Sequence, residues 1–595
     1  MQSIIFLGLN LAAWITILTI LAMFLSLIFT KLPEDVVFLS VMAILLLTGV
    51  LDTDEALGGF SSDSVVVIGV LYVVIAGLVR TGVLQWIVRN LLGIPKSYNA
   101  AIVRLMLPVA VLSSMLSNTT VVALFVNIVK MWAKKLGISP SKLLIPLSYA
   151  SGFGGTCTLI GTPPNLIISG MYTTETGHSM NIFTTTLPGL FCLAVGILSI
   201  LALQRLLPER KSADESFAET TDYTAELLVP ADSPHIGKTI AEAGLDNVSG
   251  GRLVEIVRFD HEVVSPVPAD ECLMGNDRLV FAGEVDEILH LRKTHGLVNA
   301  DHLVFSTSEV AAKRQLRTAY VIPGSPLVGQ RMTDSTFERD HQLTLVAVAR
   351  QGSRIDQSPR DILLQIGDSL LLEYPSDAKA SSDIQGLQFF DGAGIVPDIG
   401  SKTVVSCLIM LGMIVLSSFE IMPLLQSAML AAIAMLVFRC CTPRQAMNAI
   451  EWNILMIFAC SVVIGTAIEK TGIAEAIATG IMQLCGNNPI MVMAAMCLAA
   501  TFITGFISNT ATGAIFFPIV YNAAVAMGCN PMPFLISLMI AVSSSFITPI
   551  GSPTHMLVYG PGGYRFTDFL KIGSWMSIII LISNLLIVNL LYSLY

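Results

Sequence analysis

Two short polar segments with the same composition, Ser-Asn-Thr, each lie inside an otherwise apolar stretch of this chain. They occupy Ser117–Thr119 and Ser508–Thr510, which are 391 residues apart. A second polar interruption follows each of them, at Gly161–Pro163 and at Gly551–Pro553, with an offset of 390 residues. Hydroxyl and amide groups among apolar residues must line a cavity or a protein interior, because lipid cannot satisfy them. Such paired interruptions in two halves of a hydrophobic chain indicate the binding site of a transporter.

The two clusters offer neutral oxygens from hydroxyls, amides and carbonyls freed where a helix breaks, and hard cations such as Na⁺ prefer such ligands. Helices that begin after each break would direct N–H groups and a positive dipole end inward, which suits an anion. No Lys, Arg, Asp or Glu occurs from Leu105 to Val129 or from Thr501 to Met556. We therefore expect an anion to be held by dipoles, hydroxyls and bound cations. The alternative is that Ser-Asn-Thr only caps half-helices.

The composition is that of a polytopic membrane protein. Of the 595 residues, 54% are hydrophobic and 13% charged, and the mean hydropathy is +0.73. The first thirty residues lack a basic n-region and a small-residue cleavage site, so they predict a span and not a removable signal. The ten cysteines show no CxxC spacing, so we expect no transition-metal site and no disulfide framework. No nucleophile, base and orienting group occur together, and we expect neither an enzyme, nor an organic cofactor, nor a nucleic-acid partner.

The apolar segments divide into two sets of five predicted spans, each close to the ~20 residues that a crossing needs. The spans are 5–30, 35–51, 62–79, 141–172 and 182–207, then 402–418, 421–438, 452–468, 531–559 and 572–594. Gly and Pro interrupt 141–172 and 531–559, which predicts discontinuous helices. Segments 98–136 and 488–527 centre on Ser-Asn-Thr and predict re-entrant hairpins, preceded by interfacial arms at 84–93 and 473–484.

The distribution of basic residues predicts the orientation in the membrane. With five crossings per half, seventeen Lys and Arg outside the central segment fall on one side and only Lys470 on the other. The basic side is expected to be cytoplasmic. We therefore expect a multi-pass plasma (inner) membrane protein with both termini outside and residues 213–390 in the cytoplasm. Because five is odd, the second half is expected to be inverted relative to the first.

The central segment differs from both membrane halves in its charge and its alternating strands. It also carries a repeat, because Ser233–Gly237 echoes Ser325–Gly329 and Gly275–Leu279 resembles Gly367–Leu370. The predicted fold is thus a polytopic α-helical membrane protein, an inverted repeat of five spans and one hairpin each, with a cytosolic α+β insert of two tandem small domains. The predicted domains are 1–212 (first membrane repeat), 213–305 and 306–390 (insert domains) and 391–595 (second membrane repeat).

The duplicated Ser-Asn-Thr, together with Gly161–Asn165 after Gly154–Thr156, resembles the divalent anion–sodium symporter family. This resemblance covers both membrane halves and implies a homodimer that works by an elevator-type alternating-access mechanism. It implies one sodium ion held by Ser113, Ser117, Asn118 and the Gly161 carbonyl, and a second held by Asn509 and the carbonyls of Thr504, Ile507 and Gly551. It implies anion contacts from Asn118, Thr119, Thr162, Asn509, Thr510 and Ser552.

The second break departs from the family pattern, which usually reads Thr-Pro-Pro-Asn. Here it reads Ser-Pro-Thr-His, and His555 takes the last place. Two interpretations stay open: a neutral group that caps the helix break, or an additional anion contact whose charge changes near neutral pH. The central repeats resemble TrkA-C domains (the RCK C-terminal type). For these, dimerisation alone and binding of a small regulatory ligand both stay open.

The function expected from these features is sodium-coupled symport of a divalent anion. Sulfate is favoured, because members with a central insert of this type resemble the sulfate branch of the family. A di- or tricarboxylate such as succinate or citrate is the alternative. A related arsenite or proton-coupled citrate permease is less favoured, and so is a ligand-gated channel, because the chain contains no TVGYG-like filter.

Overall fold

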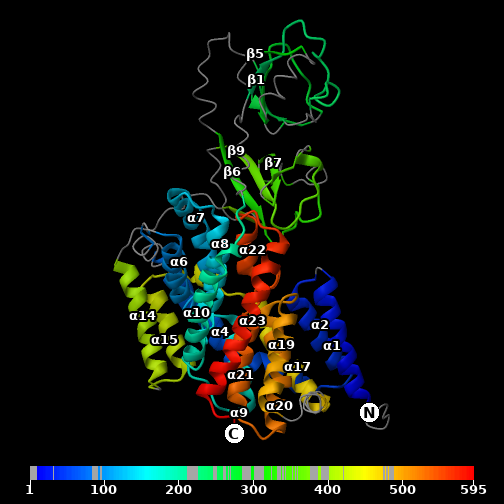
Figure 1. Cartoon of the computed structure of the whole chain (residues 1–595). Helices are drawn as coiled ribbons and strands as arrows, with labels where there is room; N and C mark the ends of the chain where they lie inside the picture. Colours follow the sequence, from blue (N-terminus) through cyan, green and yellow to red (C-terminus); the bar gives the residue numbers. More distant parts are fainter. Residues whose placement is uncertain are drawn as a thin grey trace.

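The computed structural model is a mostly helical body that carries two small β-sheets at one end, while both chain termini lie at the other end (Figure 1). The structure describes residues 10–30, 32–82, 92–93, 95, 97–210, 225–245, 251–258, 263–264, 267–268, 270–283, 296–299, 314–322, 325–331, 337, 341, 343–351, 353–355, 357, 359–375, 386–389, 401–419, 421–473, 476, 480 and 488–594. The predicted arms at 84–93 and 473–484 lie largely outside the described residues, as do the predicted domain limits near 212, 305 and 390.

The helices of the two halves follow one another in the same order. The first half holds α1 (Leu11–Phe29), α2 (Glu34–Leu47), α3 (Thr53–Gly58), α4 (Asp63–Arg80), α6 (Tyr98–Ser113), α7 (Asn118–Leu136), α8 (Ser141–Gly155), α9 (Pro163–Thr176) and α10 (Thr186–Ala202). The second half holds α14 (Ser401–Ser418), α15 (Leu424–Val437), α16 (Pro443–Asn448), α17 (Trp452–Lys470), α19 (Pro489–Ile503), α20 (Asn509–Ala526), α21 (Pro531–Ser543), α22 (Pro553–Tyr559) and α23 (Phe566–Leu591). Short 3₁₀ turns occupy Gly59–Ser61, Gln204–Leu206 and Pro359–Asp361.

Local start and stop signals also recur between the halves. A capping box opens α3, where Asp52 and Glu55 cap each other's backbone N–H groups, and Thr442 and Gln445 do the same at α16. Left-handed glycines end α4 and α17, at Gly82 and Gly472. The same local chemistry therefore shapes corresponding elements of the two halves.

The predicted discontinuities appear as helix pairs. Helices α8 and α9 are separated by a break, as are α21 and α22, and proline occupies the first turn of α9 and of α22. Proline suits this position because its missing N–H is one that a first turn leaves unpaired anyway. The hairpins α6–α7 and α19–α20 likewise turn at Ser-Asn-Thr, and the second residue of each motif, Asn118 or Asn509, begins the returning helix.

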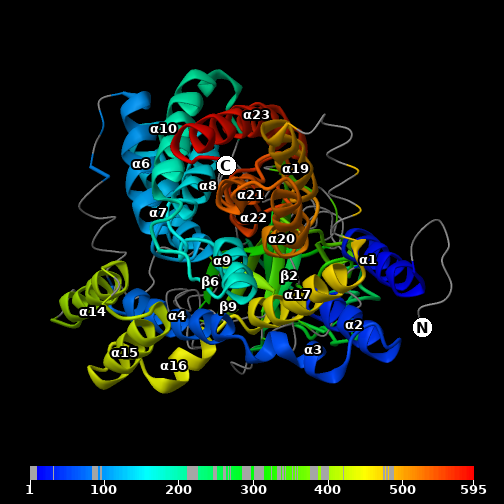
Figure 2. The ribbon, with the colours of Figure 1, turned by 90° about the horizontal axis from the view of Figure 1, so that it is seen from below.

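The helices form two groups (Figure 2). Helices α1–α4 and α14–α17 make an elongated layer, which we call the helix band. Helices α6–α10 and α19–α23 make a compact group beside it, the helix bundle. The two groups meet where α4 packs on α9 and α17 packs on α20. The band therefore touches the bundle next to a break helix of the first half and a hairpin helix of the second.

Three stretches in the described part of the chain are long and apolar enough to cross a membrane, namely 53–80, 452–470 and 566–591. Further apolar helices are shorter, between 10 and 17 residues. They include both helices that precede Ser-Asn-Thr, α6 and α19. For α6, α19 and α21 the short length follows from the interruptions, because Ser-Asn-Thr or the Gly-Pro break ends the apolar segment before it reaches full membrane length.

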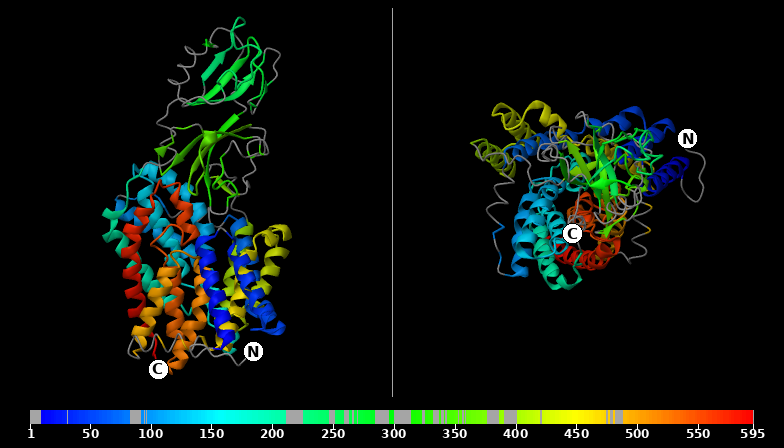
Figure 3. Two further views of the ribbon diagram at one scale, coloured as in Figure 1. Left: turned by 90° about the vertical axis from the view of Figure 1, so that its right-hand side faces the viewer. Right: turned by 90° about the horizontal axis from the view of Figure 1, so that it is seen from above.

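The central segment folds into two antiparallel sheets of five strands each, stacked one above the other on the helical body (Figure 3). The first sheet has the order β3-β2-β4-β1-β5 and the second β10-β6-β9-β7-β8. Their strands are β1 (Ala225–Leu228), β2 (Gly251–Val257), β3 (Val263–Val264), β4 (Arg278–Gly283) and β5 (Val298–Asn299), then β6 (Arg314–Val321), β7 (Thr344–Arg350), β8 (Ser353–Arg354), β9 (Ser369–Pro375) and β10 (Leu387–Phe389).

The two sheets share their topology and their irregularities. Strand for strand the order is the same, and a bulge falls between Leu253 and Glu255 in β2 and between Leu345 and Ala347 in β7. Bulges are specific features of a fold, so their recurrence at matching positions identifies the sheets as two copies of one unit. The repeat expected from the Ser-Pro segments is thus visible in the strand order.

Close packing of α23 on the second break provides a test of the bundle. A β-carbon on Gly573 would lie 1.9 Å from the Phe546 carbonyl oxygen, so Gly573→Ala forces the backbone apart. We expect a loss of roughly 1–3 kcal/mol in stability, as overpacked interiors show, measured as a lower melting temperature in detergent. Gly412→Ala in α14 is the matched control, because no atom lies within 4 Å of its added carbon. Equal melting temperatures for the two variants would contradict this packing.

Candidate functional site

The first polar cluster brings together the tip of hairpin α6–α7, the end of α8 and the start of α9. A β-carbon on Gly155 would lie 2.4 Å from the Thr162 methyl carbon and 2.7 Å from Asn118 Oδ1. One on Gly161 would lie 2.8 Å from the Ser113 carbonyl oxygen. The break therefore packs directly on the hairpin tip, and only glycine leaves room for this approach.

Three of the predicted site residues in this cluster have a buried side-chain oxygen without a hydrogen-bond partner in the described part of the chain. These oxygens are Ser113 Oγ, Asn118 Oδ1 and Thr162 Oγ1. An unsatisfied buried polar atom costs roughly 1–3 kcal/mol, and such atoms are rare in native interiors. Their gathering at one break marks a place where a ligand would complete their bonding. All three were predicted as site residues from the sequence.

A pocket opens from this cluster toward the helix band. Ser117 and Gly161 line it from the bundle, and Ile68 and Tyr72 of α4 line it from the band. Its empty volume is about 300 Å³, part of it open to the surroundings. The first cluster thus faces the boundary between the two helix groups.

The second cluster repeats the arrangement with different partners. A β-carbon on Gly551 would lie 2.6 Å from the Thr504 carbonyl oxygen and 3.2 Å from the Ser545 β-carbon. The Thr504 hydroxyl donates to Asn509 Oδ1 at 2.8 Å. Ser545, which stands where the first half has Gly155, has a buried hydroxyl without a partner among the described residues. The amide oxygen of Asn509 is therefore bonded within its cluster, whereas that of Asn118 has no partner among the described residues.

A carboxylate from a distant part of the chain contacts the second cluster. The Ser508 hydroxyl, at the tip of hairpin α19–α20, donates to Glu34 Oε2 at the start of α2. The sequence offers no acidic residue from Thr501 to Met556, so Glu34 adds a carboxylate that was not among the predicted site residues. Glu34 lies some 470 residues away in the chain, and its own surroundings carry no signal that would have linked it to Ser508.

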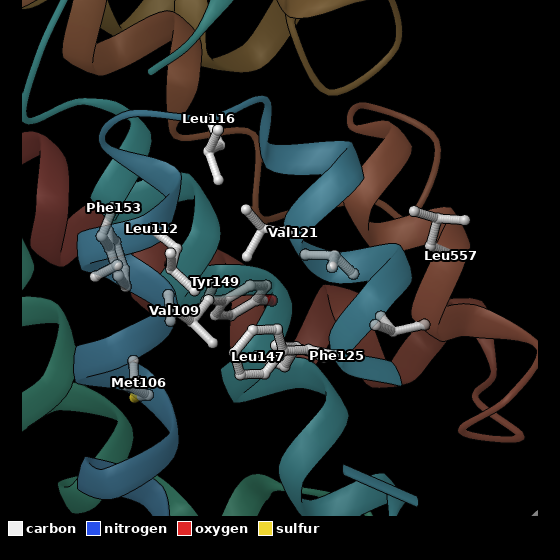
Figure 4. Packing of buried hydrophobic residues seen from close by; sticks show 14 of the residues in the cluster. Met106, Val109, Leu112, Leu116, Val121, Phe125, Leu147, Tyr149, Phe153 and Leu557 are labelled. Carbon is white, nitrogen blue, oxygen red and sulfur yellow. The ribbon is translucent and has the colours of Figure 1, made fainter. Parts of the chain in front are cut away.

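The helices that begin at the four interruptions cross in pairs. Helix α7 packs on α22, and α9 packs on α20. Figure 4 shows Leu557 of α22 beside α7, with Leu112, Val121 and Tyr149 lying together below the hairpin tip. Each pair joins a helix of the first half to one of the second. The N-terminal ends of these four helices, which carry partial positive charge, thus belong to one packed unit.

The remaining predicted contacts differ in their exposure. Thr119 is exposed, whereas its counterpart Thr510 is buried. The Ser552 hydroxyl lies 2.9 Å from that of Thr554, a neighbour that we did not predict as a site residue. Ile507 is buried at the tip of the second hairpin. Among the described residues, no group of three His, Cys, Asp or Glu side chains could hold a metal ion.

His555 is engaged by protein groups at both ring nitrogens. Its Nε2 lies 3.1 Å from the Ser545 carbonyl oxygen and therefore donates, and its Nδ1 lies 2.6 Å from Ser148 Oγ. The ring is 2% exposed and stands among Tyr149 and Phe569, with centroids 5.3 and 5.4 Å away. This environment favours the capping interpretation, with a neutral ring that accepts from Ser148. An anion contact by His555 stays a prediction.

Asn165 occupies the corresponding place in the first half. Its Nδ2 donates to the carbonyl of Gly155, at 3.4 Å, and to that of Thr158, at 3.0 Å. Asn165 and His555 are 390 residues apart, and they bind corresponding carbonyls, those of Gly155 and Ser545. Asn165 was not among the predicted site residues, although the constant offset would have been enough to identify it.

The two interpretations of His555 predict different pH profiles. An Asn can still donate to the Ser545 carbonyl, as Asn165 does in the first half, so His555→Asn should transport. We expect wild type and variant to show the same dependence of sulfate affinity on pH between about 7 and 6, where a free histidine would titrate. His555→Leu, which loses both bonds, should lose activity. A wild-type affinity that strengthens toward pH 6 and flattens in His555→Asn would instead make His555 an anion contact.

Comparison with known proteins finds transporters. A family profile described as citrate transporter (CitMHS) matches residues 24–483 and 414–595. The uncharacterized transporter sll0640 of Synechocystis is 30% identical over 579 residues, which is 94% of this chain and 94% of that protein. The probable sodium/sulfate cotransporter 3 of Chlamydomonas reinhardtii is 23% identical, covering 87% of this chain and 82% of that protein. The solved YdaH transporter of Alcanivorax borkumensis is 13% identical, with a TM-score of 0.44 over 97% of each chain.

The profile spans almost all of the chain, and the resemblance is not confined to one half. A relative with 30% identity extends over both helical halves and the two sheets between them. The duplicated breaks and hairpins described above are therefore features of a membrane transporter. The chain belongs to the citrate transporter family, CitMHS, whose members are integral membrane proteins.

Proposed function

We propose that this protein is a secondary active transporter that carries a divalent anion, sulfate first of all, together with Na⁺. The observation that carries the proposal is the pair of matching clusters, each built from a hairpin tip and a helix break. In the first, three buried oxygens lack partners among the described residues. Paired discontinuous helices at corresponding places of two repeats are the arrangement by which secondary transporters bind ions and substrates.

The first cluster supplies one sodium site from Ser113, Ser117, Asn118 and the Gly161 carbonyl. The second supplies another from Asn509 and the carbonyls of Thr504, Ile507 and Gly551. Neutral oxygens suit a hard monovalent cation. The tight approach of each break glycine to its hairpin tip supports this assignment, because it brings freed carbonyls within reach of one ion.

The anion would lie where Asn118, Thr119, Thr162, Asn509, Thr510 and Ser552 approach one another, with His555 as a further candidate. Two bound sodium ions and helix N-termini would supply the positive potential that side chains do not. Sulfate is favoured, because a relative that matches over 87% of this chain is named a sodium/sulfate cotransporter.

A di- or tricarboxylate is the second candidate. The description of the matching family names citrate, and succinate and citrate present the same carboxylate chemistry to hydroxyls and N–H groups. Both substrates would use the same two clusters. Sulfate and the carboxylates differ in the length that the site must span, so transport assays with a panel of anions would distinguish them.

An elevator-type mechanism fits the division into a band and a bundle. The bundle holds both clusters, so it would move as the transport domain against the band as scaffold. Ser508, at a hairpin tip, bonds with Glu34 at the end of α2 that faces the sheets (Figure 1). This contact supports a conformation in which the site stands near the sheet-bearing side, which is the inward-facing state if that side is cytoplasmic.

We further propose a homodimer in the plasma membrane, with inverted membrane repeats 1–212 and 391–595, both termini outside and 213–390 in the cytoplasm. Both ends lie opposite the sheets, as this orientation requires (Figure 3). The outer side of α14 exposes Val404, Leu408 and Leu411. Such an apolar face suits lipid or a second copy of the chain.

The two insert domains, 213–305 and 306–390, are proposed to be of the TrkA-C type and to accept a small regulatory ligand. The second sheet touches the bundle. Lys130 of α7 donates to the Tyr320 hydroxyl at 3.1 Å, and β-carbons on Gly367 and Gly560 would lie 2.7 Å and 2.8 Å from the Tyr559 and Tyr320 rings. The sheet therefore contacts helices α7 and α22, which both begin at the proposed anion site.

The turn that makes this contact is held by an ion pair. Asp368 is fully buried and accepts from Arg350 Nε and Nη2, both at 2.7 Å, and from the Gln365 N–H. Its hydrogen bonds raise the pKa of the Arg350 guanidinium. A ligand that disturbs this turn would act on the neighbouring Gly367 and so on Tyr559, at the end of α22.

Transport by reconstituted protein tests the proposed function. Labelled sulfate, succinate, citrate and arsenite would be offered to proteoliposomes with and without an inward sodium gradient. We expect sodium-driven accumulation of sulfate. Asn118→Leu and Asn509→Leu, which remove an amide oxygen from each sodium site, should abolish it while inserting normally, because no neutral ligand replaces that oxygen. Wild-type sodium dependence in both variants would refute the site assignment, and accumulation without a gradient would refute coupling.

The insert is expected to set the rate and not the substrate. Replacing 220–385 by a flexible linker should leave the order of preference among the four anions unchanged, because no proposed substrate contact lies in that segment. The maximal rate should change, since the contact with α7 and α22 is lost. Tyr320→Ala, which breaks the docking contact but keeps both domains, should reproduce the rate change. A folded deletion variant with a new preferred anion would contradict the assigned domain limits.

A further inference from the structure

One threonine stands three residues before each break glycine, Thr158 before Gly161 and Thr548 before Gly551. The two are 390 residues apart, the offset that relates the rest of the repeat. Both are buried, with 7% and 3% of their surface exposed. Neither belongs to the residues assigned above to sodium or to the anion.

Each hydroxyl makes the same two bonds. Thr158 Oγ1 donates to the carbonyl of Ser114, at the tip of the first hairpin, and accepts from the Gly161 N–H at 3.2 Å. Thr548 Oγ1 donates to the carbonyl of Gly505, at the tip of the second hairpin, and accepts from the Gly551 N–H at 3.1 Å. One side-chain oxygen thus joins a hairpin tip to a break in both halves.

The two bonds fall on segments that would otherwise separate. Helix α19 ends at Ile503 and the break lies more than forty residues further along the chain, so only tertiary contacts keep the tip and the break together. A hydroxyl can donate and accept at once, which an aliphatic side chain of equal size cannot. Losing it leaves a buried carbonyl and a buried N–H unpaired, which is costly in an interior that water does not reach.

The hydroxyl also binds one of several carbonyls at the hairpin tip and leaves the others for a ligand. At the second hairpin, the Thr548 hydroxyl binds the carbonyl of Gly505. The carbonyls of Thr504 and Ile507, in the same hairpin tip, are proposed ligands of sodium. The Gly551 carbonyl, the third proposed carbonyl ligand, belongs to the residue whose N–H Thr548 accepts. The threonine therefore fixes the peptide units on both sides of the proposed ion without touching it.

We propose that Thr158 and Thr548 are positioning residues, one for each cation site, which set the distance between hairpin tip and break glycine. The proposal rests on the sodium sites of the proposed function and adds to them a pair of residues that act through their neighbours. Two independent occurrences of the same pair of bonds carry it. Each threonine acts on its own cation site, so its loss should weaken the binding of one sodium ion and leave the binding of the other unchanged.

Thr158→Val and Thr548→Val remove both bonds at nearly constant volume. We expect the sodium concentration for half-maximal sulfate uptake to rise about tenfold in each variant, which corresponds to ~1.4 kcal/mol. The maximal rate at saturating sodium should stay near that of wild type, because the anion contacts are intact. Thr158→Ser and Thr548→Ser keep the hydroxyl and should restore the wild-type sodium curve.

Thr501→Val is the matched control. Thr501 is buried in the same hairpin and donates to the Ala541 carbonyl at 3.3 Å, which is not part of a break. Its sodium curve should be that of wild type. Sodium-dependent thermal stabilisation in detergent gives a second readout that does not need transport, because an ion that binds only the folded state raises the melting temperature. Thr158→Cys and Thr548→Cys, with a weaker donor, serve if valine prevents folding.

The outcomes separate the two proposals. Wild-type sodium curves in both valine or cysteine variants would overturn the positioning role while leaving sodium coupling in place. An equal shift in Thr501→Val would also overturn it, since the effect would then be general destabilisation. A wild-type protein whose sulfate uptake and melting temperature ignore sodium would overturn the proposed function, and this inference with it.

Discussion

The structure depends on how an apolar bundle accommodates broken helices. Each half interrupts two helices inside the bundle, and every interruption frees backbone N–H and carbonyl groups that lipid cannot satisfy. The chain meets this constraint by placing each break against a hairpin tip, with glycine at the contact, as Gly161 and Gly551 show. Groups that the protein itself leaves unpaired among the described residues, such as Asn118 Oδ1 and Thr162 Oγ1, are those to which the proposed function assigns ligands.

The two halves share this framework but fill it differently. Gly155 in the first half corresponds to Ser545 in the second, and Asn165 corresponds to His555. Asn165 binds the Gly155 carbonyl and His555 binds the Ser545 carbonyl, so two different side chains serve corresponding positions. The first cluster faces a pocket lined by α4, whereas the second hairpin tip bonds with a carboxylate of α2. The start of α15, which corresponds to that of α2, carries Leu424 instead. A symmetric scaffold thus holds an asymmetric site.

The sheets add a second link between distant parts of the molecule. Tyr320 and Gly367 contact residues on α7 and at the end of α22. Because α22 is only seven residues long, it connects this contact to Ser552 within two turns of helix. An insert that carries no substrate contact therefore lies close enough to influence the site through rigid helical packing.

The sequence alone determined the repeat, the breaks and the hairpins. The repeat is visible as a constant offset of 390 residues, and the breaks and hairpins follow from local chemistry, namely the polarity of Ser-Asn-Thr and of the Gly-Pro segments in apolar runs. The strands of the insert followed from their alternation, and the two sheets have the same strand order. Only the tertiary structure decided that Glu34 reaches Ser508, that Thr158 and Thr548 hold the breaks, and that His555 bonds with Ser148. These are contacts between segments remote in the chain, and packing, not local pattern, sets which remote groups meet.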